Sequence, residues 1–204
     1  MRTFGLPEFL LIVQAAQWTL ALSAIAFVGG ALLGLVVALS RTSENAVARN
    51  AARVFIQVFQ GTPLLLQLFL IFFGAPVLGL DITPWVAAGV ALVLNSAAFL
   101  AGIWRGCIEA VPRGQWEAAQ ALNLKYVARM RFVVLPQAFK IALPPTVGYV
   151  VQIIKGTSLA AIIGFTEITR AGQITNNATF QPPHVFRTVA AIYFLVCSPL
   201  PLRA

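Results

Sequence analysis

The sequence has few charged residues, only two cysteines and a single histidine. Charged residues make up 10% of its 204 residues, whereas they make up roughly a quarter of an average soluble domain. Cys107, Cys197 and His184 are too few for a disulfide framework or a Cys/His metal cluster. No phosphate-binding loop of the form G-x-x-x-x-G-K-[ST] occurs. These absences exclude most soluble folds and argue against zinc, redox and nucleotide-hydrolysing chemistry.

Hydrophobic residues, in contrast, make up 59% of the chain, and the formal net charge is +8. In a soluble protein this charge would raise the possibility of nucleic-acid binding. Here the basic residues lie at the ends of apolar segments instead of on one amphipathic surface. We therefore expect a membrane protein with no nucleic-acid partner.

Charged residues separate the apolar segments, because an ionised side chain is costly at the centre of a bilayer. A span needs about 20 apolar residues, and this predicts an all-α polytopic membrane protein of about five spans. The apolar run that follows Glu8 is too long for a cleaved signal peptide, so we expect a retained helix, with residues 1–14 outside the cytoplasm and residues 15–204 forming one membrane domain. The five expected spans are 17–40, 63–78, 83–104, 136–154 and 185–202.

Residues 43–60 have an apolar face and a polar face at helical spacing, which predicts an interfacial amphipathic helix. Gly61, Thr62 and Pro63 then end this helix and begin the second span. Within the first span, small residues recur every four positions, a pattern that lets two helix backbones approach closely. These residues are Ala26, Gly30, Gly34 and Ala38.

The distribution of Lys and Arg predicts the orientation, since cytoplasmic loops carry an excess of both. Ten of the fourteen lie on one face of the expected topology, and we assign this face to the cytoplasm, with the N-terminus outside and the C-terminus inside. The ten are Arg41, Arg49, Arg53, Arg105, Arg113, Lys125, Arg129, Arg131, Lys140 and Arg203. The other four are Arg2, Lys155, Arg170 and Arg187.

A polar stretch, 105–131, separates the third and fourth spans and contains a short helix with defined ends. Pro112 and Gly114 interrupt the preceding chain, and Glu117 is expected in the first turn, where the helix dipole favours an anion. Asn123 is suited to the left-handed position that ends a helix. Alanines between them keep the helix thin, so a partner can approach it closely.

This stretch resembles the coupling loop of ABC importer permeases. Glu117-Ala118-Ala119 is followed by three residues, a position that is usually Gly, nine further residues, and then an apolar residue two positions before Leu135-Pro136. Other segments resemble the polar amino acid permease branch in particular. They are Gly61 to Gln67, Ser96 to Ala101, Arg113 to Ala119, Leu135 to Ala138 and Lys155 to Leu159.

The resemblance implies a permease subunit of the MetI-like type I fold in a bacterial inner membrane. Its expected partners are a separate ATPase subunit, a second permease copy or paralogue, an extracytoplasmic solute-binding protein and a polar amino acid. ATP and Mg would be bound by the ATPase, so we expect no cofactor, no catalytic residue and no metal ligand in this chain. The implied ATPase-coupling residues are Glu117, Ala118, Ala119, Leu122 and Asn123.

The sequence departs from the family pattern at three positions. Asn123 stands where the family usually has Gly, Gln60 where this branch usually has Arg, and Gly102 where an acidic residue often occurs. Asn tolerates left-handed backbone geometry, so helix termination is expected to survive. The loss of both Arg and acid is either compensatory or reflects a different interface.

Polar residues within or beside the spans are candidates for a solute path, although interhelical hydrogen bonding or a hydrated rim explains them equally well. They are Gln67, Asn95, Ser96, Lys155, Thr157, Ser158 and Glu167. The alternative to a permease subunit is a self-sufficient secondary carrier or channel. Such a protein is expected to show inverted repeats or charges inside its spans, and neither is evident.

Overall fold

The computed structural model describes residues 3–200, and these contain helices and no strand. Arg2, Arg203 and the predicted end of the fifth span at Leu202 lie outside the described residues. In chain order the elements are α1 (Leu6–Thr42), α2 (Ala46–Gly61), α3 (Leu64–Val77), α4 (Pro84–Glu109), α5 (Arg113–Ala121), α6 (Tyr126–Arg129), the π-helical η1 (Met130–Val134), α7 (Leu135–Gly156), the 3-10 helix η2 (Thr157–Ile163), α8 (Ile168–Thr179) and α9 (Pro182–Cys197).

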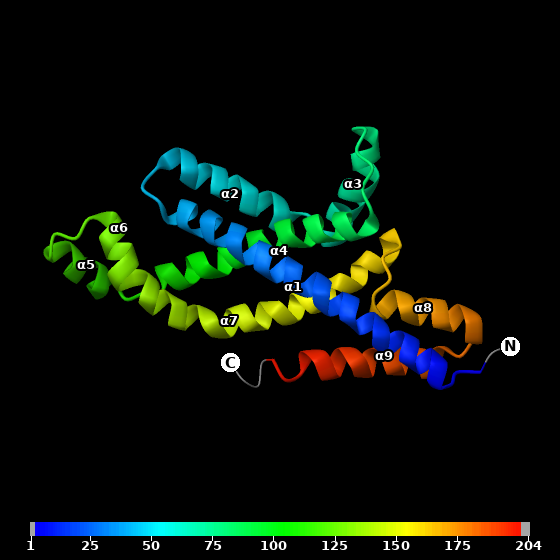
Figure 1. Cartoon of the computed structure of the whole chain (residues 1–204). Coiled ribbons are helices and arrows are strands. Elements are labelled where there is room, and N and C mark those ends of the chain that lie inside the picture. Colours follow the sequence, from blue (N-terminus) through cyan, green and yellow to red (C-terminus); the bar gives the residue numbers. More distant parts are fainter. Residues whose placement is uncertain (1–2, 201–204) are drawn as a thin grey trace.

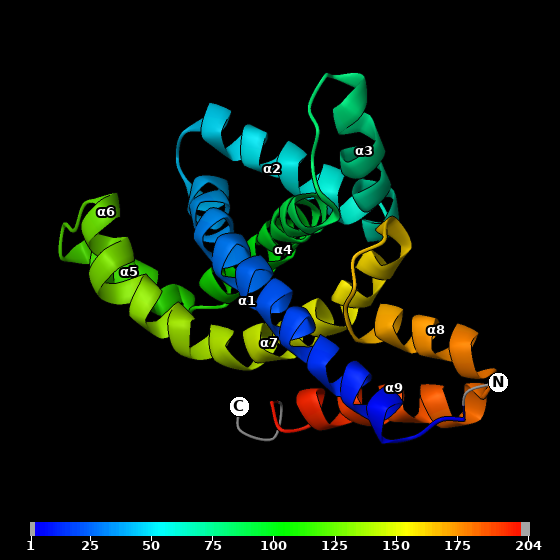
Figure 2. The ribbon, with the colours of Figure 1, turned by 45° about the vertical axis from the view of Figure 1, so that its right-hand side comes forward.

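The long helices α1, α4 and α7 make up most of an elongated bundle (Figure 1). In both views α5 and α6 lie at one end of it, and α3 and α8 lie at the other (Figure 2). An all-α architecture is therefore confirmed. The thin helix α5 is held at the end of the bundle where α1 and α4 also terminate.

Three of the expected spans correspond to helices long and apolar enough to cross a membrane: α1, α4 and the composite helix Tyr126–Ile163. The second and fifth differ from expectation, because α3 has only 14 residues and α9 only 16. Helices α2 and α3 satisfy the length and composition criterion only as a pair, and they are bent by 99°. The described residues thus contain three full-length spans, or four if the bent pair counts as one.

Two span boundaries also move. Helix α1 begins at Leu6, where the Glu8 carboxylate accepts a hydrogen bond from the Gly5 N–H (3.1 Å), so the charge caps the helix instead of preceding it. The predicted domain boundary after residue 14 lies inside α1, and it stays a prediction about membrane position. The fourth span was expected from Pro136 but its helix begins at Tyr126. The π-helical turn ends at Val134, two residues before Pro136, whose missing N–H interrupts the α-helical ladder.

The close contact of α1 with α4 forms the centre of the bundle. All four small residues of the predicted stripe, Ala26, Gly30, Gly34 and Ala38, are buried, as its packing role requires. A Cβ atom added at Gly30 would lie 2.5 Å from Ser96 Cβ, and one added at Gly34 would lie 2.9 Å from the Ala97 carbonyl oxygen. The two backbones therefore pack at a separation that only glycine allows.

Other helices pack around this pair. The amphipathic segment predicted for 43–60 is α2, whose buried Ala52 and half-buried Phe55 and Ile56 pack against α1 and α4. The N-terminal half of α1 packs against α8 and α9 through Ile12 and Ala15. Helix α1 thus contacts both ends of the bundle.

Replacement of Gly30 by alanine tests the importance of this contact. The added methyl group would overlap Ser96, so we expect Gly30→Ala to lower stability by about 1–3 kcal/mol, the usual cost of overpacking. The matched control is Gly89→Ala, because Gly89 also lies in a helix but has no neighbour within 4 Å of an added Cβ. Thermal unfolding in detergent should show a lower midpoint for Gly30→Ala only. Equal midpoints would contradict the close approach.

Candidate coupling helix and transport path

Helix α5 is a nine-residue helix, Arg113–Ala121, that projects from the end of α4. Because it begins at Arg113, Glu117 lies in its second turn, and the first turn contains no acid. The prediction that Glu117 lies in the first turn and interacts with the helix dipole is therefore wrong. The Glu117 side chain is instead solvent-exposed in the middle of the helix, where a partner can reach it.

The end of α5 has the geometry that its sequence predicts. Asn123 has φ 57°, in the left-handed region. Its N–H donates to the Gln120 carbonyl (2.8 Å), and the Leu124 N–H donates to the Ala119 carbonyl (3.1 Å). This pair of bonds is a Schellman motif, which satisfies carbonyl groups at the helix end. Asn123 thus ends the helix as Gly would.

The predicted coupling residues fall on two sides of α5. Ala119 is buried, whereas Glu117, Ala118 and Asn123 are exposed and the Leu122 side chain is 75% exposed. The exposed set forms a narrow surface with one carboxylate and one large apolar group. This composition suits a protein partner that docks on the end of the bundle.

An arginine attaches α5 to the bundle. Arg129 is buried, and its guanidinium carbon lies 5.6 Å from the Trp116 ring centroid of α5 and 5.8 Å from that of Tyr126. Its Nη2 lies 3.7 Å from Glu44 Oε1, and Tyr126 Oη donates to the Thr42 carbonyl (2.9 Å). The α5–α6 segment is therefore tied to the corner between α1 and α2.

Sequence reasoning missed this attachment, because it treated Arg129 only as one of the basic residues of the loop. The aromatic residues at positions 116 and 126 were the available signal, since Arg commonly stacks on aromatic rings. A side-chain contact between Gln115 Oε1 and Gln137 Nε2 (3.2 Å) further joins α5 to α7.

Two of the predicted path residues stabilise the bend between α2 and α3. Gln67 Nε2 lies within hydrogen-bonding distance of the Phe59 carbonyl (2.8 Å), the Thr62 carbonyl (3.0 Å) and Thr62 Oγ1 (2.9 Å). Asn95 Nδ2 donates to Gln67 Oε1 (3.3 Å), and Tyr149 Oη donates to Asn95 Oδ1 (3.5 Å). These contacts favour the interhelical hydrogen-bonding explanation for Gln67 and Asn95.

The other polar candidates do not converge on a single site. Ser96 is buried beneath Gly30 of α1. The hydroxyl groups of Thr157 and Ser158 donate to the carbonyls of Ile154 and Lys155 (2.7 Å each). Lys155 is exposed, and no carboxylate of residues 3–200 lies within 4 Å of its amino group.

Glu167 is completely buried and caps α8. Its carboxylate accepts hydrogen bonds from the N–H groups of Thr169 (2.9 Å) and Arg170 (2.8 Å) and from Tyr193 Oη of α9 (2.8 Å). Glu167 therefore contacts the backbone N–H of Arg170. An ion pair between the two residues would instead require contact with the Arg170 guanidinium. Burial raises the pKa of Glu167, and the hydrogen bonds oppose this rise.

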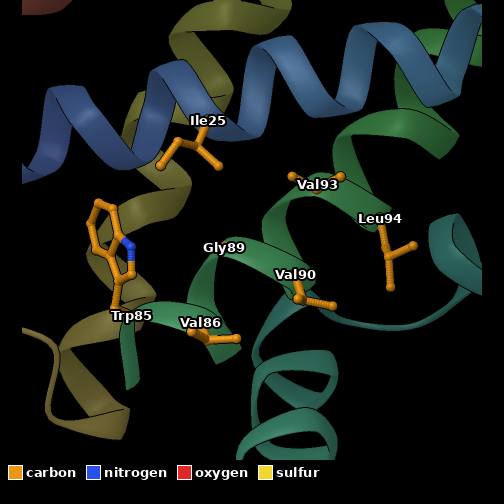
Figure 3. Close-up of a pocket in the computed structure, with 7 residues that line it drawn as sticks. All are labelled: Ile25, Trp85, Val86, Gly89, Val90, Val93 and Leu94. Carbon is orange, nitrogen blue, oxygen red and sulfur yellow. The ribbon is translucent and has the colours of Figure 1, made fainter. Parts of the chain in front are cut away.

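A pocket of about 320 Å³ lies between α1 and α4 (Figure 3). It is lined by Ile25, Trp85, Val86, Gly89, Val90, Val93 and Leu94. None of these side chains is charged, so a polar amino acid bound there would leave its ammonium and carboxylate groups unpaired at high cost. This pocket is not a suitable site for a polar solute.

The two departures at positions 60 and 102 are structurally linked. Gln60 Nε2 donates to the Ala98 carbonyl (3.0 Å), and a Cβ added at Gly102 would lie 2.8 Å from the same nitrogen. The Gln60 amide therefore occupies the space that a side chain at position 102 would need. With Gln60 in this position, the absence of a side chain at Gly102 avoids a close contact between the two.

Long apolar helices define the chain as a membrane protein, and the anchored helix α5 leaves an exposed surface at one end of it. Residues 30–201 match the family described as "Binding-protein-dependent transport system inner membrane component". The chain belongs to this family.

Relatives and solved structures agree with this assignment. The chain is 36% identical to the probable amino-acid ABC transporter permease protein YckA of Bacillus subtilis, over 95% of this chain and 86% of that protein. It is 35% identical to the glutamine transport system permease protein GlnP of Escherichia coli, over 93% of this chain and 88% of that protein.

A crystal structure of an amino acid ABC transporter with histidines superposes with a TM-score of 0.87 at 34% identity, covering 95% of this chain and 94% of the other. An inward-facing MetNI methionine ABC transporter has a TM-score of 0.82 at 19% identity, covering 98% of this chain and 95% of the other, which supports the fold. The MetI-like type I permease fold is therefore confirmed.

The left-handed backbone at Asn123 gives a test of the α5 end. Asn123→Gly should preserve the thermal unfolding midpoint, because Gly adopts positive φ without strain. Asn123→Val should lower stability by about 1–2 kcal/mol, since a residue with a branched Cβ is strained there. Equal midpoints for the Gly and Val variants, measured in the same detergent, would show that position 123 is not left-handed.

Burial of Glu167 gives a test by pH. Since its folded-state pKa is raised, the stability it contributes is fully present below the ordinary carboxyl value of about 4.3 and is lost as pH rises through the raised pKa. The unfolding midpoint of the wild type should therefore fall relative to that of Glu167→Gln as pH rises from about 4 to 8. A pH-independent difference would contradict a raised pKa.

Proposed function

We propose that this chain is the permease subunit of an ATP-driven ABC importer for polar amino acids. The observation that carries this proposal is the coupling helix: α5 presents Glu117, Ala118, Leu122 and Asn123 to solvent at the end of a bundle whose family serves binding-protein-dependent transport. The printed names of the relatives, amino-acid and glutamine permeases, support the substrate class.

In this proposal a separate ATPase subunit docks on the exposed surface of α5 and supplies ATP and Mg binding. The permease itself performs no covalent chemistry. Because Arg129 and Tyr126 attach α5–α6 to the α1–α2 corner through Glu44 and the Thr42 carbonyl, a displacement of α5 is transmitted to the spans. A second permease copy or paralogue completes the path.

The chain would be a multi-pass protein of a bacterial inner membrane. The excess of Lys and Arg at the α5 end supports a cytoplasmic position for that end. A solute-binding protein would then deliver the amino acid at the α3–α8 end. Exposed Lys155 near that end has no carboxylate partner within residues 3–200, so it is the most suitable of the path candidates to meet a solute carboxylate or the binding protein.

Replacement of Glu117 by arginine should uncouple ATP hydrolysis from uptake, because it reverses the only charge in the middle of the α5 docking surface. We expect membrane insertion to be retained, since Glu117 is exposed. The measurement is amino acid uptake per ATP hydrolysed in vesicles that contain the complete complex. Glu117→Asp, which keeps the carboxylate on the same exposed surface of α5, is the control and should keep the wild-type ratio. A Glu117→Arg complex with the wild-type ratio would refute the coupling role.

The alternative, a self-sufficient carrier or channel, makes a different prediction. Vesicles that contain this chain without any ATPase subunit should then take up polar amino acids down an ion or solute gradient. We expect no such uptake. The exposed helix α5 favours the subunit, because an independent carrier has no need of a docking surface.

A further inference from the structure

Three arginines converge on a second pocket at the α5 end of the bundle. Its volume is about 190 Å³, and α1, α2 and α4 each contribute an arginine. It is lined by Arg41, Arg53, Ile56, Gln57, Gln60, Gly102 and Arg105. The pocket is smaller than the roughly 300–1,000 Å³ typical of sites for drug-sized ligands, so it suits a compact group.

The positive charge of this pocket is only partly compensated. Arg105 Nη1 lies 3.3 Å from Glu109 Oε1, in an exposed pair one helical turn apart. For Arg41 and Arg53, no acceptor within residues 3–200 accepts a hydrogen bond from either guanidinium. Gly102 contributes no side chain, and Gln60 contributes an amide. Three like charges around one cavity repel one another, so an anion bound between them would stabilise this arrangement.

We propose that this pocket binds the phosphate group of an anionic phospholipid. Guanidinium groups recognise phosphate oxygens through paired N–H donors, and Gln57 and Gln60 add amide donors. Arg41 lies in the last turn of the long apolar helix α1, and Arg105 lies four residues before the end of the long apolar helix α4. This is the depth at which lipid headgroups are found.

The outer surface of α2 favours a lipid over a free anion. Val54 and Val58 directly follow Arg53 and Gln57 in sequence, which places them about 100° further around the helix. Their side chains are 58% and 51% exposed, and Val47, two turns earlier, is 78% exposed. A phosphate held by the arginines would therefore have an apolar helix face beside it, along which the acyl chains can pack.

The proposal depends on the membrane position of the chain and not on transport, so its failure would leave the proposed function unaffected. The probe is dihexanoyl-phosphatidylglycerol, added to the purified full-length chain in a neutral detergent and counted by native mass spectrometry. Each basic residue near a membrane surface contributes about a fivefold factor in affinity for an anionic lipid. Arg53→Gln combined with Arg105→Gln should therefore weaken retention roughly 30-fold.

The control is Arg113→Gln combined with Arg131→Gln, which removes the same charge from exposed positions outside the pocket and should leave retention unchanged. Arg53→Lys keeps the charge and loses only the paired N–H donors, so its retention of the lipid should fall less than that of Arg53→Gln. Dihexanoyl-phosphatidylcholine should bind more weakly, because its choline cation faces the arginines. Equal retention by the two double variants would overturn the site, and inorganic phosphate that binds as tightly as the lipid would overturn the lipid assignment.

Discussion

The close approach of α1 and α4 is the constraint on which the rest of the structure depends. In a bilayer, association of apolar helices is driven by van der Waals packing and hydrogen bonds, because lipid is as apolar as leucine. Gly30 and Gly34 supply this packing by leaving no side chain between the backbones. Helices α2 and α7 also pack against this pair. The α1–α4 contact therefore fixes where α1 and α4 end, and α5 follows α4 after only three residues.

A second constraint acts where the chain departs from helix inside the bundle. A backbone break in an apolar environment leaves carbonyl and N–H groups that must find partners. At Thr62 and Pro63 the partners are supplied by Gln67, and Asn95 and Tyr149 extend the network across three helices. A polar residue in a span is therefore explained first by the backbone groups that it satisfies nearby, and only then by contact with a solute. The same reasoning applies to Glu167, whose carboxylate satisfies the first N–H groups of α8.

Local patterns in the sequence predicted the features that depend on local physics. Hydrophobic length predicted α1 and α4, four-residue spacing predicted the buried stripe, and the left-handed tolerance of Asn predicted the end of α5. The errors arose where tertiary contacts override local polarity. The charge of Arg129 suggested a loop, yet Trp116 and Tyr126 cover it and allow the long helix to begin ten residues before Pro136. No spacing rule could reveal that Gln60 occupies the place of a side chain at position 102.

These contacts also limit how α5 can move. Separating α5–α6 from the α1–α2 corner would break a hydrogen bond worth about 1 kcal/mol and an ion pair that adds little because Glu44 is exposed. The cation–π contacts of Arg129 lie within α5–α6, and the one with Trp116, worth about 0.5–2 kcal/mol, opposes bending between these two helices. Bending between α5 and α6 would also disrupt the Schellman motif at Asn123. A force applied to α5 therefore meets less resistance when α5, α6 and the end of α1 move together. Because α1 continues without interruption to its contacts with α8 and α9, such a movement reaches the opposite end of the bundle.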